Sequence, residues 1–456
     1  MSTTFGDQSL TIVCPSNGED VGTVRSAGPA EVAAAVAAAR HAQESWAQTS
    51  AQERGRYLHA MADALEREKE RLADLNHRET GKTLEDSRGG VDAGISTLRQ
   101  YAELGPLHRG HSLRGELYAA DYTMTRPRGV AVALTPWNDP VAVAMGLIGA
   151  ALVTGNTVIH KPSERNPHLG IYLGEVLSAV LPADVHITLT GGPQVGVELT
   201  RSAIDVIAHV GSTATGKAIT LEAARTGAHV IRENGGNDPL IVDRDVDPQW
   251  AAGQAALGCF ANAGQICTSV ERIYVHHDVA EPFIDALVTE ATRLNSSPGQ
   301  PLVDVSHRDH VHGHVAAAIS AGARALTGAE IPTGPGAHYP ATVLVQCEED
   351  MAVMAEETFG PVAAITVVDS FEEGLALGAA GRYGLAATVL TTRIEHALQS
   401  AARLHVGTLK INGVFGGAPG GSAQPHAESG QGFGYGPELL DEMTRTSVVH
   451  IEAGRS

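Results

Sequence analysis

Two hydrophobic patterns alternate along this chain. In the first, apolar residues recur every three or four positions with charged residues between them, as at Leu58, Met61, Leu65 and Leu72, which predicts amphipathic helices. In the second, short runs are apolar throughout, as in Val130–Leu134, which is typical of parallel strands covered on both faces. From residue 129 onward the two patterns alternate, which predicts an α/β fold with a doubly wound parallel sheet.

The bounds of each element follow from where its pattern starts and stops. The predicted helices span residues 29–47, 51–79, 91–103, 140–154, 167–181, 195–201, 216–226, 248–262, 280–294, 309–323, 371–379 and 394–404. The predicted strands span residues 117–126, 130–134, 157–160, 185–189, 206–210, 230–231, 271–275, 341–345, 362–368, 386–390 and 443–451. Residues 413–436 are rich in glycine and polar residues, so they are predicted to form a loop.

Composition narrows the class of protein. A length of 456 residues favours two or three domains, and 43% hydrophobic with 18% charged residues is ordinary for a globular enzyme. The formal net charge of -20 argues against nucleic acid or an anionic membrane surface as a partner. The longest apolar stretch, Val141 to Val153, is shorter than the roughly 20 residues that span a bilayer, so a buried helix is predicted there and no membrane partner is expected.

Cysteine usage indicates the compartment. The four cysteines are widely spaced and form no CxxC pair: Cys14, Cys259, Cys267 and Cys347. This usage fits a reducing cytoplasm better than a disulfide framework. No charged-then-apolar leader opens the sequence, so no signal peptide is predicted and the expected location is the cytoplasm.

Cys267 is the first candidate for chemistry. It lies in a run of small and polar residues from Ala261 to Ser269, and Gly264 allows a tight turn just before it. A thiol is strongly nucleophilic only as a thiolate, which requires polar surroundings and a nearby base or dipole. An arbitrary cysteine is more often a small buried hydrophobe, so other motifs must decide between the two interpretations.

Four other polar segments lie where the pattern ends a strand or begins a turn. They are residues 135–140 (TPWNDP), 161–164 (KPSE), 232–237 (RENGGN) and 356–361 (EETFGP). Ligands of open parallel sheets bind at such strand ends. Together with the cysteine segment, these motifs resemble the NAD(P)-dependent aldehyde dehydrogenase superfamily in residue type, order and separation, over nearly the whole chain.

The resemblance implies an enzyme that oxidises an aldehyde to a carboxylic acid. Cys267 would attack the carbonyl, and the side-chain amide of Asn138 with the backbone N–H of Cys267 would stabilise the oxyanion. Glu233 would activate the water that hydrolyses the resulting thioester. A lone glutamate is usually a solvated surface residue, but the adjoining Asn-Gly-Gly segment favours the catalytic role.

The resemblance also implies the cofactor NAD, with NADP left open. Lys161 and Glu164 match the pair that holds the adenosine ribose, and a carboxylate there disfavours the 2′-phosphate of NADP. Ser212 precedes a predicted helix whose first N–H groups can bind pyrophosphate. The remaining implied contacts lie at the adenine (Gly192, Gly196), along the cleft (Trp137) and at the nicotinamide ribose (Glu357, Phe359).

The implied architecture has three parts. A Rossmann-like cofactor domain would comprise residues 1–110 and 129–235, and an α/β catalytic domain residues 236–428. A small β extension for oligomerisation would comprise residues 111–128 and 436–456, with residues 115–128 paired to the C-terminal strand. That pairing has a physical reason, because an exposed strand near Leu117 would otherwise be an unprotected edge. A homodimer or homotetramer is expected.

Two departures from the family pattern leave the aldehyde unidentified. Asp139 stands where relatives usually carry an apolar residue at the substrate tunnel. It either caps a helix that begins at Pro140, or it faces the tunnel and favours a polar or cationic aldehyde. Residues 424–430 also depart from the family pattern where relatives complete the substrate funnel. Polar aldehydes and semialdehydes are the candidates.

Four histidines near a predicted helix start have a spacing that could gather imidazoles at a metal: His307, His310, His312 and His314. They have no cysteine partner nearby. Ordinary surface histidines are therefore the favoured interpretation, and no metal site is predicted.

Three other functions remain open. Acyl transfer to a thiol such as coenzyme A would not need a water-activating base, so Glu233 argues against it. A non-catalytic binding or structural protein of this fold would not need Cys267, Asn138 and Glu233 together. A cysteine hydrolase would use a histidine as base, but the sequence has no local Cys–His signature.

Overall fold

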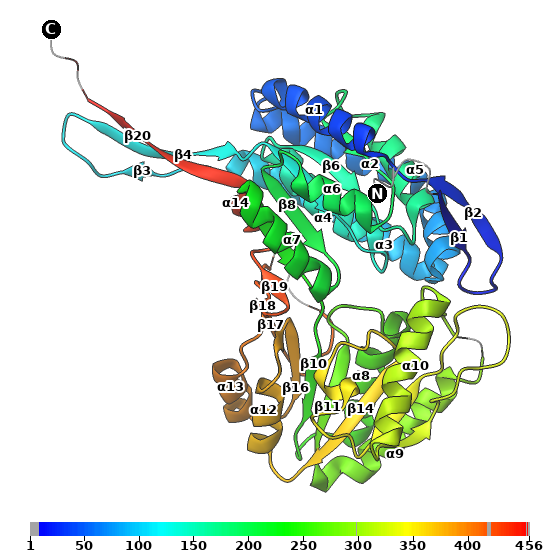
Figure 1. Cartoon of the computed structure of the whole chain (residues 1–456). Coiled ribbons are helices and arrows are strands. Elements are labelled where there is room, and N and C mark those ends of the chain that lie inside the picture. Colours follow the sequence, from blue (N-terminus) through cyan, green and yellow to red (C-terminus); the bar gives the residue numbers. More distant parts are fainter. Residues whose placement is uncertain (1–8, 298, 417–420, 453, 455–456) are drawn as a thin grey trace.

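Two α/β lobes and a projecting β arm make up the chain (Figure 1). The computed structural model describes residues 9–297, 299–416, 421–452 and 454. Each lobe is built around one mainly parallel sheet with helices on both faces, and the arm is a separate three-stranded antiparallel sheet. The predicted α/β class with doubly wound parallel sheets is confirmed.

The sheet of the first lobe has six strands in the order β19-β9-β8-β5-β6-β7. The five strands from β9 to β7 in this order are parallel to one another, and the edge strand β19 is antiparallel to β9. Every residue of β5 and β6 is buried, which explains why β5 is apolar without alternation. β6 also carries the buried polar side chains of Thr157, His160 and Lys161. The strands are β5 (Val130–Leu134), β6 (Thr157–Lys161), β7 (His186–Thr188), β8 (Val206–Val210), β9 (His229–Glu233) and β19 (Gly430–Gln431).

Helices cover both faces of this sheet. One core packs α2, α3, α4 and α5 against it, and a second core packs α1, α6 and α7 on the other face. A small hairpin, β1 (Ser9–Val13) with β2 (Asp20–Arg25), lies beside this lobe. The helices are α1 (Pro29–Trp46), α2 (Ala51–Thr80), α3 (Leu84–Leu104), α4 (Pro140–Val153), α5 (Pro167–Ser178), α6 (Pro193–Arg201) and α7 (Thr213–Thr226), with the 3-10 turn η2 (Gly105–Leu107).

The second lobe has a seven-stranded sheet in the order β12-β13-β14-β11-β10-β16-β17, parallel except for the edge strand β12. Its strands are β10 (Asp238–Val242), β11 (Val270–His276), β12 (Arg324–Thr327), β13 (Thr342–Val345), β14 (Val362–Val368), β16 (Ala386–Leu390) and β17 (Thr408–Ile411). One core contains α8 and α9, and the core on the other face contains α10 and α12. The helices are α8 (Pro248–Phe260), the 3-10 turn η3 (Ala261–Gly264), α9 (His277–Leu294), α10 (Val305–Ser320), α11 (Ala352–Ala355), α12 (Phe371–Ala379) and α13 (Ile394–Arg403).

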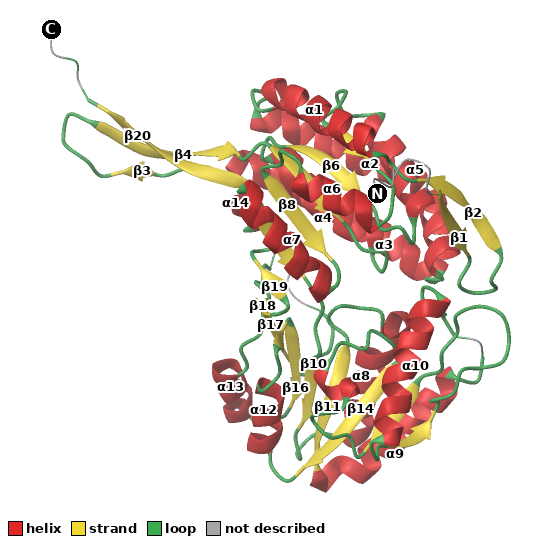
Figure 2. Ribbon diagram, in the orientation of Figure 1, coloured by secondary structure: helices red, strands yellow, loops and turns green. Residues whose placement is uncertain are grey.

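The arm consists of β3 (Ser112–Leu113), β4 (Ala120–Pro127) and β20 (Thr444–Ile451), and it extends away from the first lobe (Figure 2). β20 pairs antiparallel with β4 along its whole length, so the pairing predicted between residues 115–128 and the C-terminal strand is found. The short helix α14 (Leu439–Glu442) leads into β20. In the described part of the chain, no helix is long and apolar enough to cross a membrane.

Several elements differ from their predicted bounds. The helix predicted at residues 91–103 begins at Leu84, because the Thr83 hydroxyl accepts a hydrogen bond from Asp86 N (3.0 Å) and caps the first turn. The strand predicted from residue 117 begins only at Ala120, since Leu117 and Tyr118 lie in the preceding loop and are 85% exposed.

The strands β1, β2, β10, β12 and β17 were not predicted. β10 opens with Asp238-Pro239, a pair typical of a turn, and the strand tolerates the proline because the register with β11 shifts between these two residues. The edge strands β12 and β17 are half-exposed and too short to show alternation. The loop predicted at residues 413–436 contains β19 and the short strand β18 (His426–Ala427), which pairs with β15 (Tyr383–Gly384). Residues 417–420 of that loop lie outside the described part.

Candidate active site

The two lobes meet where β9 leads into β10. β9 ends at Glu233, residues 234–237 form the connection, and β10 begins at Asp238. A cavity of about 790 Å³ lies at this junction, with lining residues from both lobes. Asn138, Glu233 and Cys267 all line it, although they are far apart in the sequence. The structure therefore brings the three predicted catalytic residues together.

Cys267 lies in a tightly folded segment between α8 and β11. Asn262 and Ala263 both adopt left-handed backbone angles, with φ of 51° and 54°. Gly264 has φ of 72°, and a Cβ there would lie 2.1 Å from the carbonyl oxygen of Gly360, so only glycine fits. The side-chain amide of Gln265 donates to Asn262 O (3.0 Å), and Asn262 Nδ2 donates to Gln265 O (3.0 Å). These bonds fix the backbone that leads to the thiol.

The Cys267 thiol has three carboxyl groups in its surroundings. Its side chain is half-buried. Burial, and then the neighbouring carboxyl groups of Glu233, Asp238 and Glu357, raise the pKa of the thiol to about 12, whereas Lys410 acts in the opposite direction. At neutral pH this thiol is almost entirely protonated, so its ionisation has to be assisted before it can act as a nucleophile.

Glu233 is the last residue of β9, and its carboxyl group enters the cavity from the first lobe. The backbone N–H of Gly434 donates to Glu233 Oε1 (3.1 Å). Burial raises the pKa of Glu233 to about 7, and the Gly434 hydrogen bond opposes that shift. A carboxyl group with a pKa near 7 is suited to exchange protons at neutral pH.

Asn138 approaches the cysteine segment from the loop between β5 and α4. Its side-chain Nδ2 donates to the carbonyl oxygen of Gln265 (3.1 Å), two residues before the thiol. An amide NH₂ carries two donor hydrogens, so a second N–H can serve a bound ligand. The contact places the amide group of Asn138 at the same end of the cavity as Cys267.

A second cavity, of about 690 Å³, continues from the first along the carboxyl ends of the first sheet. Both cavities are lined by Trp137 and Ser212. Lys161, Glu164 and Gly196 line the second cavity, and Lys161 Nζ lies 3.7 Å from Glu164 Oε2. Gly192 is the residue before α6. It does not itself line this cavity, but the next residue, Pro193, does.

Ser212 stands at the start of α7, where the two cavities join. Its hydroxyl oxygen accepts a hydrogen bond from Thr215 N (3.3 Å) and caps the helix. Ala214 and Thr215 in the first turn also line the second cavity. The N-terminal end of α7 therefore faces the cavity, a position that favours anionic groups.

Aromatic rings form one side of the first cavity. Trp137 lies edge-on to Phe359, with ring centroids 5.6 Å apart, and the guanidinium of Arg165 lies 5.3 Å from the Trp137 ring. Phe359 has a left-handed backbone (φ 53°), which is uncommon for a residue other than glycine. Both residues line the cavity, so the predicted cleft-lining role of Trp137 is consistent with its position.

Glu357 lies on the same side, against the connection between β9 and β10. Its Oε1 accepts a hydrogen bond from Gly236 N (3.1 Å), and a Cβ on Gly235 would lie 1.9 Å from its Oε2. The Gly-Gly pair in residues 232–237 thus leaves room for this carboxyl group. Burial and neighbouring acids raise the pKa of Glu357 well above its usual range.

Glu271 is a site residue that the sequence did not single out. Its buried carboxyl group accepts hydrogen bonds from Thr358 N (2.9 Å), Phe359 N (2.8 Å) and Asn237 Nδ2 (3.1 Å). It therefore fixes the segment that carries Glu357 and Phe359. The available signal was a glutamate at the start of a predicted strand that continues with the apolar residues Ile273 and Val275. A carboxyl group buried in such a strand requires hydrogen-bond partners.

Asp139 does not cap α4 with its side chain. It occupies the N-cap position, but its carboxylate makes no capping hydrogen bond and instead lies 3.2 Å from Lys82 Nζ. Both residues line the first cavity. A Cβ on Gly90 would lie 2.6 Å from Asp139 Oδ1, so this glycine on α3 makes room for the carboxylate. The capping interpretation is wrong, and the position of Asp139 supports the alternative that it faces the cavity.

The four histidines on α10 have different neighbours. His307 Nε2 lies 2.8 Å from Phe359 O, His312 Nδ1 lies 3.3 Å from Tyr339 Oη, and His314 Nδ1 lies 3.2 Å from Thr358 Oγ1. Only His310 is exposed; the other three are half-buried. The interpretation of all four as surface histidines is therefore wrong for three of them, which pack against the loops beside the cavity.

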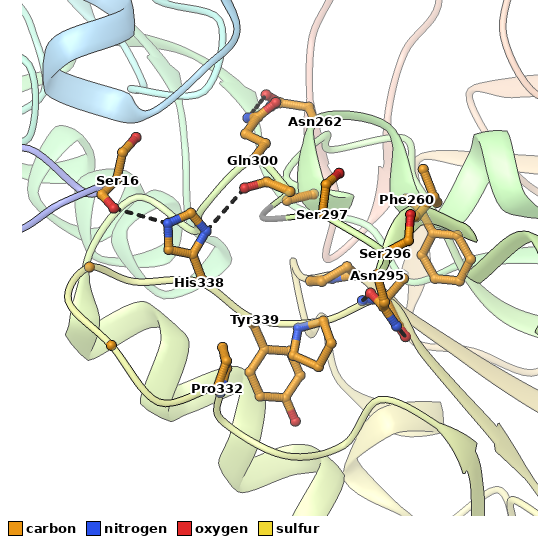
Figure 3. Close-up of a pocket in the computed structure, with 18 of the residues that line it drawn as sticks. Ser16, Phe260, Asn262, Asn295, Ser296, Ser297, Gln300, Pro332, His338 and Tyr339 are labelled. Atoms are coloured by element: carbon orange, nitrogen blue, oxygen red, sulfur yellow. Dashed lines mark hydrogen bonds between the residues drawn. The ribbon is translucent and has the colours of Figure 1, made fainter. Parts of the chain in front are cut away.

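A separate cavity of about 710 Å³ is lined by Phe260, Asn262 and residues of the loops after α9 and before β13 (Figure 3). Asn262 lines both this cavity and the first one. The imidazole of His338 connects two loops that line this cavity. Its Nε2 lies 2.9 Å from Ser16 O, and its Nδ1 lies 3.0 Å from Gly299 O. Its described lining contains none of the predicted site residues, so we assign the chemistry to the junction between the lobes.

Comparison with known proteins agrees with this site. The profile of the "Aldehyde dehydrogenase family" matches residues 3–449. Betaine aldehyde dehydrogenase of Bacillus subtilis (strain 168) is 34% identical, over 97% of this chain and 94% of that protein. The crystal structure of an NAD-dependent aldehyde dehydrogenase from Sinorhizobium meliloti is similar with a TM-score of 0.95 and 31% identity, over 98% of this chain and 92% of that one. The crystal structure of betaine aldehyde dehydrogenase from Staphylococcus aureus in complex with NAD+ is similar with a TM-score of 0.95 and 28% identity, over 98% of this chain and 92% of that one.

The chain belongs to the aldehyde dehydrogenase family. This confirms the resemblance carried by the five motifs, and it identifies the chain as an oxidoreductase that acts on aldehydes. Nothing in the comparisons supports a non-catalytic binding or structural protein.

Proposed function

We propose that this chain oxidises an aldehyde to a carboxylic acid with NAD, and that Cys267, Glu233 and Asn138 perform the chemistry. The observation that carries the proposal is the meeting of these three residues in one cavity. That cavity continues into a second one whose lining suits a dinucleotide. The relative from Staphylococcus aureus, whose fold this chain shares, was solved in complex with NAD+.

The polar groups along the two cavities fit NAD. Lys161 and Glu164 at one end suit the ribose hydroxyls of the adenosine, and the carboxylate of Glu164 disfavours a 2′-phosphate. The N-terminal end of α7, after Ser212, suits the pyrophosphate. Glu357 and Phe359 at the other end suit the nicotinamide ribose. When bound, NAD supplies the acceptor for the hydride that leaves the substrate carbon.

The first half of the reaction forms a bond to sulfur. Cys267 gives up its thiol proton to solvent, and the resulting thiolate attacks the carbonyl carbon. The electrons of the carbonyl double bond move to oxygen, giving a thiohemiacetal oxyanion. Asn138 Nδ2 and the backbone N–H of Cys267 donate to that oxygen, and such donors are each worth about 3–4 kcal/mol. When the oxyanion re-forms the carbonyl and hydride leaves the carbon, Cys267 is left as a thioester.

The second half releases the acid. Glu233 takes a proton from water while the water oxygen attacks the thioester carbon. The carbon–sulfur bond breaks, the carboxylic acid leaves, and the Cys267 thiolate is restored. The raised pKa of Glu233, about 7, makes it a more effective base near neutral pH than an ordinary glutamate. A base placed for water favours hydrolysis over acyl transfer to coenzyme A.

Asp139 and Lys82 bear on the choice of aldehyde. They line the same cavity as Cys267, and Glu85 and Asp86 lie at the same end of α3 and also line it. This wall is polar and mainly acidic, so we propose aldehydes that carry a polar or cationic group as the substrate class. An aldehyde of purely hydrocarbon character would leave these charges desolvated without a partner.

The three-part architecture and the assembly belong to the same proposal. Residues 1–110 and 129–235 form the cofactor domain, residues 236–428 the catalytic domain, and residues 111–128 and 436–456 the extension. The arm leaves apolar side chains exposed, among them Leu113 (41%), Val448 (67%) and Ile451 (52%). Covering them in a homodimer or homotetramer would bury apolar surface and protect the strand edges.

We place the enzyme in the cytoplasm. All four cysteines are free thiols, including the half-buried Cys14 and Cys267. Free thiols persist in a reducing compartment.

The proposal is tested by following reduced-nicotinamide absorbance with NAD or NADP and a panel of amino, hydroxy, carboxy and alkyl aldehydes. Turnover is expected with NAD and to be abolished in Cys267→Ala. Cys14→Ala is the matched control, because Cys14 is also half-buried but is not among the residues that line the two cavities, and this variant should retain turnover. Absence of turnover across the panel, or equal turnover in Cys267→Ala, would overturn the proposal.

A further inference from the structure

Arg165 lies in the loop between β6 and α5 and lines both the first and the second cavity. In the described part of the chain, it is the only lysine or arginine that lines both. The other residues shared by the two linings are uncharged: Pro136, Trp137, Val210, Gly211 and Ser212. Arg165 therefore stands at the passage between the two cavities.

Two contacts hold the guanidinium group of Arg165. It lies 5.3 Å from the centre of the Trp137 ring, and its Nε lies 2.8 Å from Asp304 Oδ2. Asp304 is fixed in turn, because its Oδ1 accepts a hydrogen bond from His307 N (2.7 Å) and caps the first turn of α10. The ion pair thus joins a loop of the first lobe to a helix of the second. A guanidinium held in this way loses little conformational freedom when it binds a ligand.

Arg165 differs from the other two lysines and arginines of the cavity walls in what its head group contacts. Lys82 Nζ lies 3.2 Å from Asp139 Oδ1, and Lys161 Nζ lies 3.7 Å from Glu164 Oε2, so each ammonium is paired with a carboxylate of its own cavity. The ion pair of Arg165 is made through Nε with Asp304, which lines neither cavity. The remaining N–H donors belong to its two Nη nitrogens, and their planar arrangement matches the oxygens of a phosphate group.

We propose that Arg165 binds the pyrophosphate of NAD together with the N-terminal end of α7. The inference rests on the placement of NAD along the two cavities under the proposed function. Lys161 and Glu164, which suit the adenosine ribose, line only the second cavity, whereas Arg165 and Ser212 line both. Arg165 therefore lies beside the middle of the dinucleotide, where its two negative charges are, and it supplies the cation that the uncharged residues around it lack.

The test is the affinity for reduced NAD, measured by fluorescence titration, followed by its displacement with ADP-ribose or with adenosine. ADP-ribose contains the pyrophosphate and adenosine does not. Arg165→Met should weaken the binding of reduced NAD and of ADP-ribose by about 10–100-fold, the size expected for a lost hydrogen bond to a charged group. The affinity for adenosine should stay within about twofold. Arg165→Lys keeps the charge without the planar group, so its loss should be smaller.

Arg99→Met is the matched control, because Arg99 is also in the first lobe, pairs with Asp63 (3.4 Å) and lines neither cavity. Its affinities should equal those of the wild-type chain. Thermal unfolding without ligand is measured on each variant, and Arg165→Gln replaces the methionine variant if that one does not fold.

Unchanged binding of reduced NAD and ADP-ribose in Arg165→Met would overturn the inference. Equal weakening of ADP-ribose and adenosine would also overturn it and would assign Arg165 to the ion pair between the lobes alone. A loss confined to reduced NADP would place the guanidinium at the 2′-phosphate instead. Because these titrations need no turnover, failure of the proposed function appears separately, as a wild-type chain that binds reduced NAD but oxidises no aldehyde.

Discussion

The backbone N–H of Gly434 donates a hydrogen bond to Glu233 Oε1 over 3.1 Å, between residues 201 positions apart. Gly434 lies in the C-terminal segment that passes from β19 to α14, so this segment orients the carboxyl group at the end of β9. A Cβ on residue 434 would lie 2.1 Å from Glu233 Cγ. Only glycine allows the backbone to approach this closely, and the position of the proposed base depends on it.

Gly434→Ala should therefore displace Glu233 and slow hydrolysis of the thioester by about 10–100-fold, a misplacement effect of the size that general bases show. The first turnover, which needs Cys267 rather than Glu233, should still release reduced nicotinamide in a burst. Rapid-mixing absorbance separates the burst from the steady state. Gly313→Ala on α10 is the matched control, since a Cβ there meets nothing within 4 Å. Equal loss of burst and steady state would contradict this assignment.

Hydrolysis should rise with pH through about 7. Glu233 acts as a base only when it is ionised, and burial raises its pKa to about 7, so the active carboxylate is scarce below that pH and predominant above it. The steady-state rate under substrate saturation, measured from pH 5 to 9 where the enzyme stays folded, checks this. Glu233→Gln should remove the rise, and a wild-type rate that is flat across this range would count against Glu233 as the base.

Glu271→Ala should destabilise the segment that carries Glu357 and Phe359. The substitution leaves the buried N–H groups of Thr358 and Phe359 without their acceptor, at a cost of about 1–3 kcal/mol for each unpaired group. Urea unfolding should show the loss, and titration calorimetry should show weaker NAD binding. Glu271→Gln retains an acceptor oxygen, so its free energy of unfolding and its affinity for NAD should fall less than those of the alanine variant. Unchanged stability and cofactor affinity in the alanine variant would show that this carboxyl group does not hold the segment.

Asp139→Asn should change which aldehydes are preferred. The carboxylate lines the cavity and is only partly balanced by Lys82, so it should attract an ammonium group on the substrate by roughly 1 kcal/mol, about fivefold in KM. The KM of an amino aldehyde should rise by about that factor, while that of a neutral alkyl aldehyde of similar length should not. A parallel rise for both aldehydes would assign Asp139 a structural role instead.

The sequence predicted the alternation of strands and helices because the buried strands of both sheets contain short runs of apolar residues, of which β5 is apolar throughout. It also located the catalytic and cofactor candidates, because Asn138, Lys161 and Glu233 stand at or just after strand ends. It missed β12 and β17, whose half-exposed residues lack a clear period, and β10, whose Asp-Pro opening is typical of a turn.

The contacts that tune the site could not be predicted in the same way. Gly434 N donates a hydrogen bond to Glu233, and Phe359 N donates one to Glu271, each across a long separation in sequence. Such contacts depend on strand order and on the path of the C-terminal segment, which hydrophobic periodicity does not encode. Asp139 shows the opposite error, because a local capping rule fitted its position while its side chain pairs with Lys82.

The central claim is a thioester on Cys267 that Glu233 helps water to hydrolyse, and intact-protein mass spectrometry of Glu233→Gln tests it most directly. After incubation with NAD and a substrate aldehyde, the variant should gain the mass of one acyl group, and peptide mapping should place that group on Cys267. The wild-type chain should carry little of it, because hydrolysis is fast. Release of reduced nicotinamide by the variant without any acyl mass, or with the acyl group on another residue, would contradict the account.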